Sequence, residues 1–272
     1  MKSYRFWYYV VLLNLGGEGK MQVMSFNVRY INPWDEGKRS WEYRRDLVID
    51  TIRKQKADII GFQEVKPLAY EFLKEQLKEY DSINTWREAC EEPEGNPVFY
   101  KEELFTLVDK GSFWLSETPE VMSIDWGAGC YRICSYVILI EKATEKKFVV
   151  FNTHLDNVSE EARIKGINVI LNKMVEFGSL PAILMGDFNA EEDSETYRNA
   201  TNYLLDTRLC AKETMKSCTF HNWGSKEHEV CIDYMLISKT GFHVNSYKVV
   251  TDTYDGVFVS DHYQLSVNLE LS

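Results

Sequence analysis

Apolar residues follow two different patterns along this chain. Residues 57–65 (ADIIGFQEV) and 181–190 (PAILMGDFNA) are almost continuously apolar, which predicts strands that are buried on both faces. Residues 67–80 and 159–177 instead place apolar side chains every three or four positions, after an initial proline and an initial serine respectively. Both are therefore predicted to be helices. Because strand and helix patterns alternate, we expect β-sheets covered by helices.

The remaining patterns complete one layered domain. Helices are also predicted from Ser40 to about Lys56 and over 194–205. No internal repeat, low-complexity segment or linker divides the sequence. We therefore expect an N-terminal extension at 1–20 and a single α/β (α+β) domain over 21–272. The further predicted strands are 21–30, 97–101, 105–116, 132–142, 146–156, 231–238, 247–252 and 262–271.

The N-terminal extension allows two interpretations. An apolar stretch at 6–13 follows two basic residues and precedes a small-x-small triplet at 17–19, as in a short secretory signal. The stretch is also rich in aromatic residues and is interrupted by Asn14, which fits an added strand or a leader equally well. It is too short to span a bilayer, so no transmembrane anchor is expected. The location is left open between the cytoplasm and export.

Charge limits the kinds of partner that this chain is expected to bind. The net charge is −11, from 42 acidic and 31 basic residues. Proteins that grip long nucleic acids through phosphates usually carry a basic stripe, and the nearest candidates, 37–45 and 141–148, are short and interleaved with acids. Strong binding of long DNA is therefore not expected. Cys130, Cys134 and Cys231 are interpreted as small core residues.

Aromatic residues are frequent, at 14% of the chain, and seven of them are tryptophans. Several tryptophans stand in or beside predicted loops, where substrate-binding side chains tend to lie. We expect one or two of these to line a pocket and the others to pack. The tryptophans in question are Trp34, Trp41, Trp114, Trp126 and Trp223.

Six polar clusters stand at or beside the ends of apolar runs. Carboxylates and imidazoles beside core residues are costly unless they are paired, hydrogen-bonded or bound to a metal. Six such clusters favour convergence into a single site at one edge of the sheets. They are SFNVR with Asn27, GFQEV with Glu64, FNTHLDN with His154 and Asp156, MGDFNA with Asp187 and Asn189, CIDYM with Asp233, and VSDHY with Asp261 and His262.

The residue types in these clusters narrow the chemistry. Carboxylate and amide oxygens without cysteine suit a hard cation such as Mg²⁺ or Mn²⁺. Two histidines with carboxylate neighbours suit proton handling or charge stabilisation near neutral pH. The sequence contains no G-x-S-x-G elbow, P-loop or G-x-G-x-x-G fingerprint. Metal-assisted attack of water on a phosphoester fits this inventory best.

The ordered set FNV, QEV, NTHLD, GDFNA, IDYM and SDH resembles the endonuclease/exonuclease/phosphatase (DNase I-like) superfamily over roughly residues 21–270. That group includes DNase I-like nucleases, apurinic endonucleases, neutral sphingomyelinases, inositol polyphosphate 5-phosphatases and Ccr4-type deadenylases. The resemblance is to a bacterial-type, single-domain member. It implies a four-layer sandwich of two packed mixed β-sheets flanked by helices. It also implies a Mg²⁺-dependent hydrolase that acts on ester bonds.

The resemblance also implies roles for individual residues. Glu64 matches the principal metal-binding glutamate, Asn27 an asparagine that supports metal and phosphate, and Asp261 an aspartate near the metal or its waters. Asp187 matches an aspartate that orients the attacking water, and Asn189 an asparagine that holds the scissile phosphate. His262 matches a histidine that stabilises charge, and Asp233 the carboxylate that orients this histidine. His154 matches a histidine that contacts the phosphate or the leaving group.

Three residues near these motifs have open interpretations. Arg29 stands where some members of the superfamily carry an acid, and it fits either a contact to substrate phosphate or a buried salt bridge. Arg132 precedes a predicted strand and fits either a phosphate clamp or an ordinary surface arginine. Asp156 fits either support for the site or the start of the following helix.

The predicted substrate is a phosphorylated small molecule or a short nucleic acid. The motifs look closer to Ccr4-like and bacterial branches than to apurinic endonucleases, but they do not separate a phosphodiesterase from a phosphomonoesterase. One alternative is a nuclease or 3′-exonuclease on single-stranded RNA or DNA, which needs stacking aromatics. An alternative of another class is a non-catalytic relative that binds phosphate. The number of metals and the oligomeric state are left open.

Overall fold

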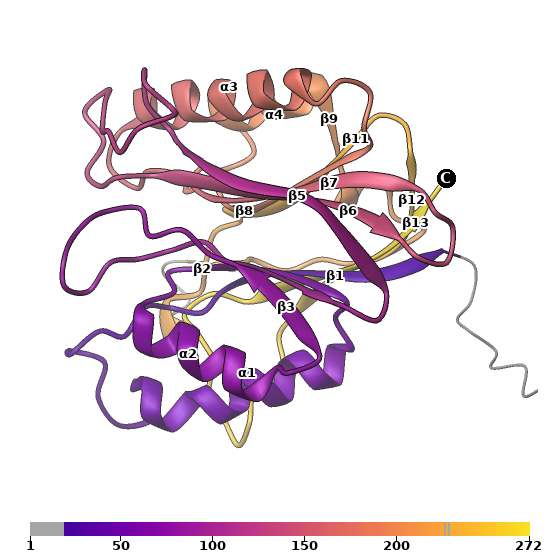
Figure 1. The fold of residues 1–272 in the computed structure, drawn as a ribbon. Coiled ribbons are helices and arrows are strands. Elements are labelled where there is room, and N and C mark those ends of the chain that lie inside the picture. Colours follow the sequence, from indigo (N-terminus) through magenta and orange to yellow (C-terminus); the bar gives the residue numbers. More distant parts are fainter. Residues whose placement is uncertain (1–18, 226, 228) are drawn as a thin grey trace, which may run out of the picture.

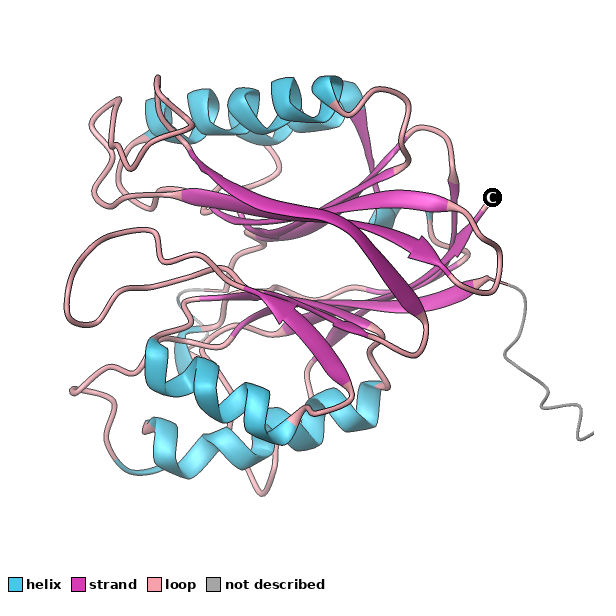
Figure 2. Cartoon of the chain, in the orientation of Figure 1, coloured by secondary structure: helices cyan, strands magenta, loops and turns pink. Residues whose placement is uncertain are grey.

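The computed structural model describes residues 19–225, 227 and 229–272. The predicted signal or leader falls mainly on residues 1–18, which lie outside the described residues. Two β-sheets lie face to face between two layers of helices (Figures 1 and 2). Helices α1 (Trp41–Gln55) and α2 (Pro67–Gln76) cover one sheet, and α3 (Glu160–Glu176) and α4 (Glu195–Tyr203) cover the other. The predicted four-layer α/β sandwich is therefore confirmed.

The first sheet has seven strands and contains both ends of the described chain. Strand β1 runs parallel to β2 and antiparallel to β13, so the beginning of β13 lies at the same edge as the ends of β1 and β2. The strand order is β10 (Glu213–Met215), β12 (Phe242–Val250), β13 (Gln264–Leu271), β1 (Lys20–Asn27), β2 (Ile59–Gln63), β4 (Val98–Lys101) and β3 (Tyr80–Ile83).

The second sheet has six strands built around a parallel pair. Strand β7 runs parallel to β8, whereas β6 and β7 form the predicted antiparallel hairpin. The order is β5 (Phe105–Trp114), β6 (Ile133–Glu141), β7 (Lys147–His154), β8 (Ala182–Asp187), β11 (Asp233–Ser238) and β9 (Leu204–Asp206). Short helical turns complete the fold at α5 (Thr207–Cys210), η1 (Gly37–Arg39) and η2 (Asn222–Gly224).

Serine side chains cap two of the helices, and the cap at Ser159 was predicted. The Ser159 hydroxyl accepts the Ala162 N–H at the start of α3 (3.2 Å), and Ser194 does the same for Tyr197 at the start of α4 (3.1 Å). Ser40 also stands immediately before its helix, but its hydroxyl donates to the Gly37 carbonyl (2.9 Å) instead. The α1 start therefore lacks the expected side-chain cap.

Several short elements differ from the sequence prediction. Strands β3, β9 and β10 and helix α5 span only three or four residues, too few for a recognisable period. The helix predicted over 67–80 ends at Gln76, and Tyr80 already belongs to β3. The strand predicted at 247–252 is the second half of β12. In the first half of β12, buried apolar residues are interspersed with exposed or half-buried polar ones.

Three apolar cores hold the four layers together. One lies between the two sheets and includes Val23 and Ile59 of the first sheet and Val150 and Ile183 of the second. A second core joins the six-stranded sheet to α3 and α4. A third joins the seven-stranded sheet to α1 and α2. Each sheet is therefore covered on both faces, which explains why its central strands are almost continuously apolar.

A polar contact crosses the core between the sheets. The side-chain amide of Asn152 (β7) donates to the Phe62 and Pro97 carbonyls (2.8 and 3.0 Å) and accepts from Gln63 Nε2 (2.6 Å). Gly61 lies against it, and a Cβ there would come within 2.8 Å of the Asn152 amide. Because buried polar groups need partners, this contact fixes how the sheets lie on one another.

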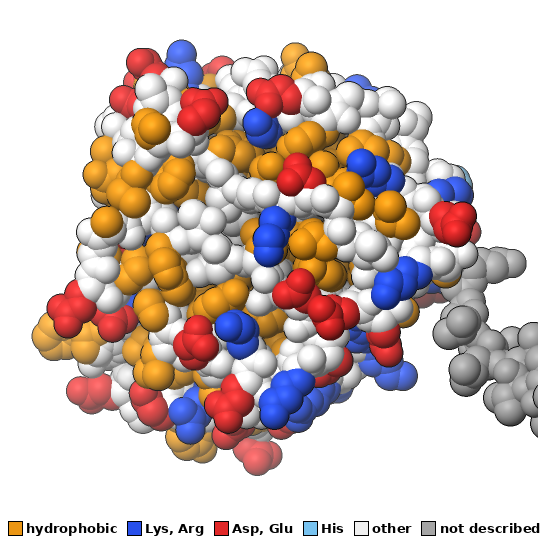
Figure 3. Space-filling view, in the orientation of Figure 1, with side chains coloured by type: hydrophobic (Ala, Val, Ile, Leu, Met, Phe, Trp, Pro, Cys, Tyr) orange, Lys and Arg blue, Asp and Glu red, His pale blue; other side chains and the backbone are white. Residues whose placement is uncertain are grey.

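The surface carries charges of both signs. On the face drawn in Figure 3, basic side chains stand singly among acidic and apolar ones rather than in one basic area. Within the described part of the chain, no helix is both long and apolar enough to cross a membrane.

We predict that Asn152→Ala will lower the free energy of unfolding by about 2–4 kcal/mol, because it removes three buried hydrogen bonds, two to the Phe62 and Pro97 carbonyls and one from the Gln63 amide. Urea denaturation will measure the change. Asn202→Ala on the exposed side of α4 is the control, with an expected change of about 0.5 kcal/mol or less. Equal stability of the two variants would contradict the structural role of Asn152.

Candidate active site

The strand register brings the first four polar clusters along the chain to one edge. In the parallel pair β1 and β2, Asn27 lies opposite Gln63, so that Glu64 follows at the same end. In the parallel pair β7 and β8, His154 lies opposite Asp187. The carboxyl ends of these four strands point the same way in the two stacked sheets (Figure 1).

The last two clusters along the chain reach this edge on antiparallel strands. Asp233 is the first residue of β11 and lies opposite Asp187 of β8. Asp261 and His262 stand just before β13, which pairs with the end of β1. Gly186 permits the close approach of β7, because a Cβ at this position would lie 1.9 Å from the Thr153 carbonyl oxygen.

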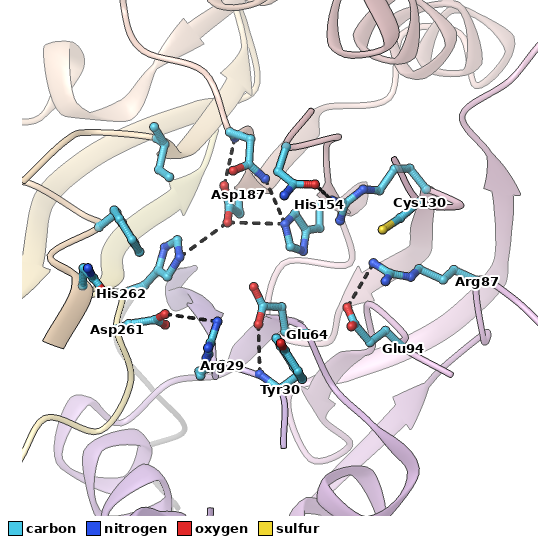
Figure 4. Close-up of a pocket in the computed structure, with 16 residues that line it drawn as sticks. Arg29, Tyr30, Glu64, Arg87, Glu94, Cys130, His154, Asp187, Asp261 and His262 are labelled. Carbon is cyan, nitrogen blue, oxygen red and sulfur yellow. Dashed lines mark hydrogen bonds and ion pairs between the residues drawn. The ribbon is translucent and has the colours of Figure 1, made fainter. Parts of the chain in front are cut away.

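A pocket of about 660 Å³ opens at this edge. Figure 4 shows Glu64, His154 and Asp187 near its centre, with Asp261 and His262 on one side and Arg87 and Glu94 on the other. Sixteen residues line it: Arg29, Tyr30, Glu64, Arg87, Glu94, Cys130, Arg132, His154, Asn157, Asp187, Asn189, Phe220, Asn222, Ile232, Asp261 and His262.

Glu64 is held in place from two directions. Its backbone is left-handed (φ +61°), and its carboxylate accepts from the Tyr30 N–H (2.9 Å) and the Asn27 amide (3.0 Å). Burial works to raise the pKa of Glu64, but the nearby His262 charge and these two hydrogen bonds outweigh it and hold the pKa below its ordinary value. Glu64 is therefore a fixed, ionised carboxylate.

Asp187 is a buried acid beside other carboxylates of the site. Its carboxylate accepts from the Asn27 amide (3.0 Å) and the Asn189 N–H (2.9 Å). Burial and the neighbouring carboxylate of Asp233 raise the pKa of Asp187 to about 7. A buried acid that is poorly compensated by the protein is well suited to a nearby cation.

The two site histidines have opposite electrostatic surroundings. His262 Nδ1 lies 2.9 Å from Asp233; burial opposes its charge, but Asp233 and Asp187 raise the pKa of His262 well above its ordinary value. Burial and the charges of Arg132 and Arg87 instead lower the pKa of His154 well below it. His262 is therefore the charged histidine and His154 the neutral one.

Part of this cluster has the composition of a metal site. Glu64, His154 and Asp187 each offer a ligand atom within 4.8 Å of the others. Oxygen donors dominate, which suits a hard divalent cation. Of the other two predicted metal neighbours, Asn27 directs its amide nitrogen at Glu64 and Asp187, and Asp261 lies 3.5 Å from the Arg29 guanidinium.

Arg29 and Arg132 both line the pocket. Arg29 pairs with Asp35 (3.0 Å) as well as with Asp261, so one side chain both forms a salt bridge and lines the pocket. Arg132 is only 6% exposed, and its interpretation as an ordinary surface arginine is therefore wrong.

Asp156 combines the two roles left open for it. One carboxylate oxygen accepts the Val158 and Ser159 N–H groups at the start of α3, at 2.9 and 2.8 Å. The other lies 3.4 Å from Arg132 Nε. Asp156 therefore begins a helix and positions an arginine of the pocket with the same side chain.

Sequence reasoning missed one wall of the pocket. Arg87 and Glu94 stand in the loop between β3 and β4, and neither adjoins a strand-end motif, so that no pattern marked them. Cys130 was expected in the core but is half-buried and lines the pocket. The expectation that one or two tryptophans line the pocket was also wrong, because none stands among its sixteen lining residues in the described chain.

Comparisons with known proteins agree with this geometry. The sequence profile of the Endonuclease/Exonuclease/phosphatase family matches residues 24–262. The Bacteroides thetaiotaomicron mannosyl-6-phosphatase Bt3783 is similar in structure, with a TM-score of 0.87 and 33% identity over 92% of this chain and 99% of that one. An uncharacterized protein of Acanthamoeba polyphaga mimivirus, L388, is 27% identical over 92% of this chain and its own full length.

A more distant similarity is to an RNA-degrading subunit. The CCR4-Not complex 3′-5′-exoribonuclease subunit Ccr4 of Aspergillus niger is 23% identical over 58% of this chain. The match covers 32% of that protein, so this chain corresponds to only about a third of it.

We predict that Asp187→Asn will stabilise the metal-free protein at pH 8, by about 1 kcal/mol or more. A raised folded-state pKa means that the contribution of Asp187 to stability is present below its ordinary pKa of 3.8 and is lost as the pH rises through about 7. The neutral amide of Asn does not ionise, so the variant avoids this loss of stability at pH 8. At pH 5 the wild-type carboxyl group is itself largely neutral, so the stability difference between variant and wild type will be smaller. Thermal unfolding in EDTA at both pH values will measure it.

Asp156→Asn provides the matched contrast to Asp187→Asn. Burial works to raise the pKa of Asp156, but the N–H groups of Ser159, Val158 and Gly129 outweigh it and lower the pKa. An amide cannot accept all of these bonds, so we expect a loss of about 1–3 kcal/mol at pH 8. If both variants lose stability equally, the electrostatic interpretation of Asp187 is wrong.

Proposed function

The chain belongs to the Endonuclease/Exonuclease/phosphatase family, and on that premise we propose that it is a divalent-metal-dependent phosphoesterase. It hydrolyses a phosphoester bond by metal-assisted attack of water, on a small or short phosphorylated substrate. The observation that carries this proposal is the group formed by Glu64, His154 and Asp187, which faces the charged His262 within the same pocket.

Glu64 and Asp187 are the residues proposed to hold Mg²⁺ or Mn²⁺, with Asp261 near the cation or its waters. When bound there, the cation supplies positive charge that polarises the phosphoryl oxygens. Asn27 holds both carboxylates in place through its amide nitrogen. Its proposed role is therefore to orient the metal-binding oxygens.

Asp187 is also proposed to orient the attacking water. Its buried carboxylate lies within the same group as Glu64 and His154, so a water beside the bound cation would lie within its reach. Asn189 lies next to it, with its amide nitrogen 3.0 Å from His154 Nε2. Asn189 and His154 are proposed to contact the scissile phosphate or the leaving group.

His262 is proposed to stabilise the charge that develops on the phosphate. Asp233 accepts from its Nδ1, which orients the ring, and because the ring is charged its Nε2 is also a donor, 3.7 Å from Asp187. A donor that is already oriented need not reorganise when charge develops during the reaction. Arg29 and Arg132 are proposed as further substrate contacts on either side of this centre.

The comparisons and the pocket favour a small substrate over a polynucleotide. The relative named as a mannosyl-6-phosphatase is similar over nearly the whole chain, whereas the similarity to Ccr4 covers little more than half. Of the lining residues only Tyr30 and Phe220 carry large aromatic rings, and stacking platforms are what single-stranded nucleic acids require. A 3′-exonuclease is the second candidate because of the Ccr4 similarity.

We predict that Glu64→Ala and His262→Ala will each lower metal-dependent turnover by about 10²-fold or more, since each removes a group that acts on developing charge. The assay compares bis-p-nitrophenyl phosphate, p-nitrophenyl phosphate, hexose phosphates, inositol phosphates, single-stranded DNA and oligo(A) with Mg²⁺, Mn²⁺ or EDTA. Asn202→Ala, remote from the pocket, is the control. Turnover that persists in EDTA would refute the metal requirement, and a folded protein without any turnover would favour a phosphate-binding function.

A further inference from the structure

One wall of the pocket is built by the loop between β3 and β4. Gly95 and Val65 exchange two backbone hydrogen bonds (2.8 and 3.3 Å). Glu64 precedes Val65 and Glu94 precedes Gly95, so this pairing places the loop directly beside the metal-binding candidate. The wall consequently faces the same space as the centre of the site (Figure 4).

Arg87 and Glu94 form a fixed ion pair on this wall. The guanidinium Nη1 lies 3.0 Å from the Glu94 carboxylate, and the Arg87 N–H also donates to the Glu94 carbonyl (2.9 Å). The Trp114 indole donates to the Arg87 carbonyl (2.8 Å). Both charged side chains are largely buried, with 10% and 15% of their surface exposed, so the pair is organised before any ligand arrives.

Arg132 adds a second guanidinium next to this pair. Its Nε lies 3.4 Å from Asp156 and its Nη2 donates to Asn157 (3.0 Å). The remaining nitrogen, Nη1, is buried and has no hydrogen-bond partner among the described residues. A buried donor without a partner loses free energy, so a ligand oxygen at this place would bind favourably.

Charges on the wall are nearly balanced. Arg87 is paired with Glu94 and also with Glu88 (3.3 Å), and Arg132 is paired with Asp156. The wall therefore has no excess positive charge to receive a second phosphate group. A phosphate placed against the Glu94 carboxylate would be repelled.

We propose that this wall, formed by Arg87, Glu94 and Arg132, binds the alcohol portion of the substrate, and that this portion is a neutral polyol such as a sugar. The substrate would then be a sugar phosphomonoester. Each hydroxyl both donates and accepts, so a wall that carries one carboxylate and two guanidinium groups matches neighbouring hydroxyls. The inference rests on the proposed phosphoesterase function, since the phosphate must lie at Glu64, Asp187 and His262.

The test measures substrate preference rather than activity alone. We compare kcat/KM for glucose 6-phosphate, mannose 6-phosphate and glycerol 3-phosphate with that for p-nitrophenyl phosphate, whose leaving group has no alcohol hydroxyls, and for oligo(A). In Glu94→Gln, and independently in Arg87→Lys, the preference for the better hexose phosphate over p-nitrophenyl phosphate will fall by about 10-fold or more, mainly through KM. Glu92→Gln, an exposed acid of the same loop, will keep the wild-type ratio.

The outcomes separate this inference from the function on which it rests. A ratio that is unchanged in folded Glu94→Gln and Arg87→Lys overturns the role of the wall while phosphoesterase activity stands. A wild-type protein that prefers oligo(A) to every sugar phosphate also overturns it. A folded protein that hydrolyses none of these substrates, p-nitrophenyl phosphate included, overturns the proposed function and this inference together.

Discussion

The buried amide contact between Gln63 and Asn152 is the constraint on which the site depends. It joins β2 of one sheet to β7 of the other through a 2.6 Å hydrogen bond, beside the apolar core between the sheets. Apolar contact alone tolerates sliding, whereas a short hydrogen bond between two buried side chains requires a particular alignment of the sheets. Glu64 follows directly after Gln63, and His154 stands two residues after Asn152. The contact that aligns the sheets therefore also aligns the two halves of the candidate metal site.

The site concentrates buried charge where the two sheets meet, and the protein alone does not fully neutralise this charge. Burial and Asp233 raise the pKa of Asp187 to about 7, while Asp233 also orients His262. Buried, poorly compensated charges of this kind lower the stability of the fold, and they are typical of functional sites. His154 is kept neutral by burial and by two arginines, so two histidines in one pocket have different functions. Their difference comes from neighbours that lie far away in the sequence.

Strand ends and loops contribute different things to the pocket. The strand ends supply the carboxylates, amides and histidines that are suited to metal and phosphate, and the pleated register holds these residues firmly. The loop between β3 and β4 supplies Arg87 and Glu94, which line the pocket on the side away from His262 and which we propose to bind the alcohol portion of the substrate. Loops are the usual place for such selectivity because they vary without disturbing the sheets. The absence of tryptophan among the lining residues of the described chain fits a polar ligand better than a stacked base.

The sequence by itself determined the layered fold, most strands and helices, and the polar residues that gather at one edge. It did so because hydrophobic period, serine caps and polar strand ends are local signals that do not require long-range contacts. Only the tertiary structure decided which of these residues meet. Asn27 reaches Asp187 across 160 positions, and His262 reaches Asp233 across 29. Such contacts between residues far apart in the sequence also decide the opposite charge states of the two histidines and the burial of Arg132. They decide the wall formed with Arg87 and Glu94 as well, and no local pattern encodes any of these features.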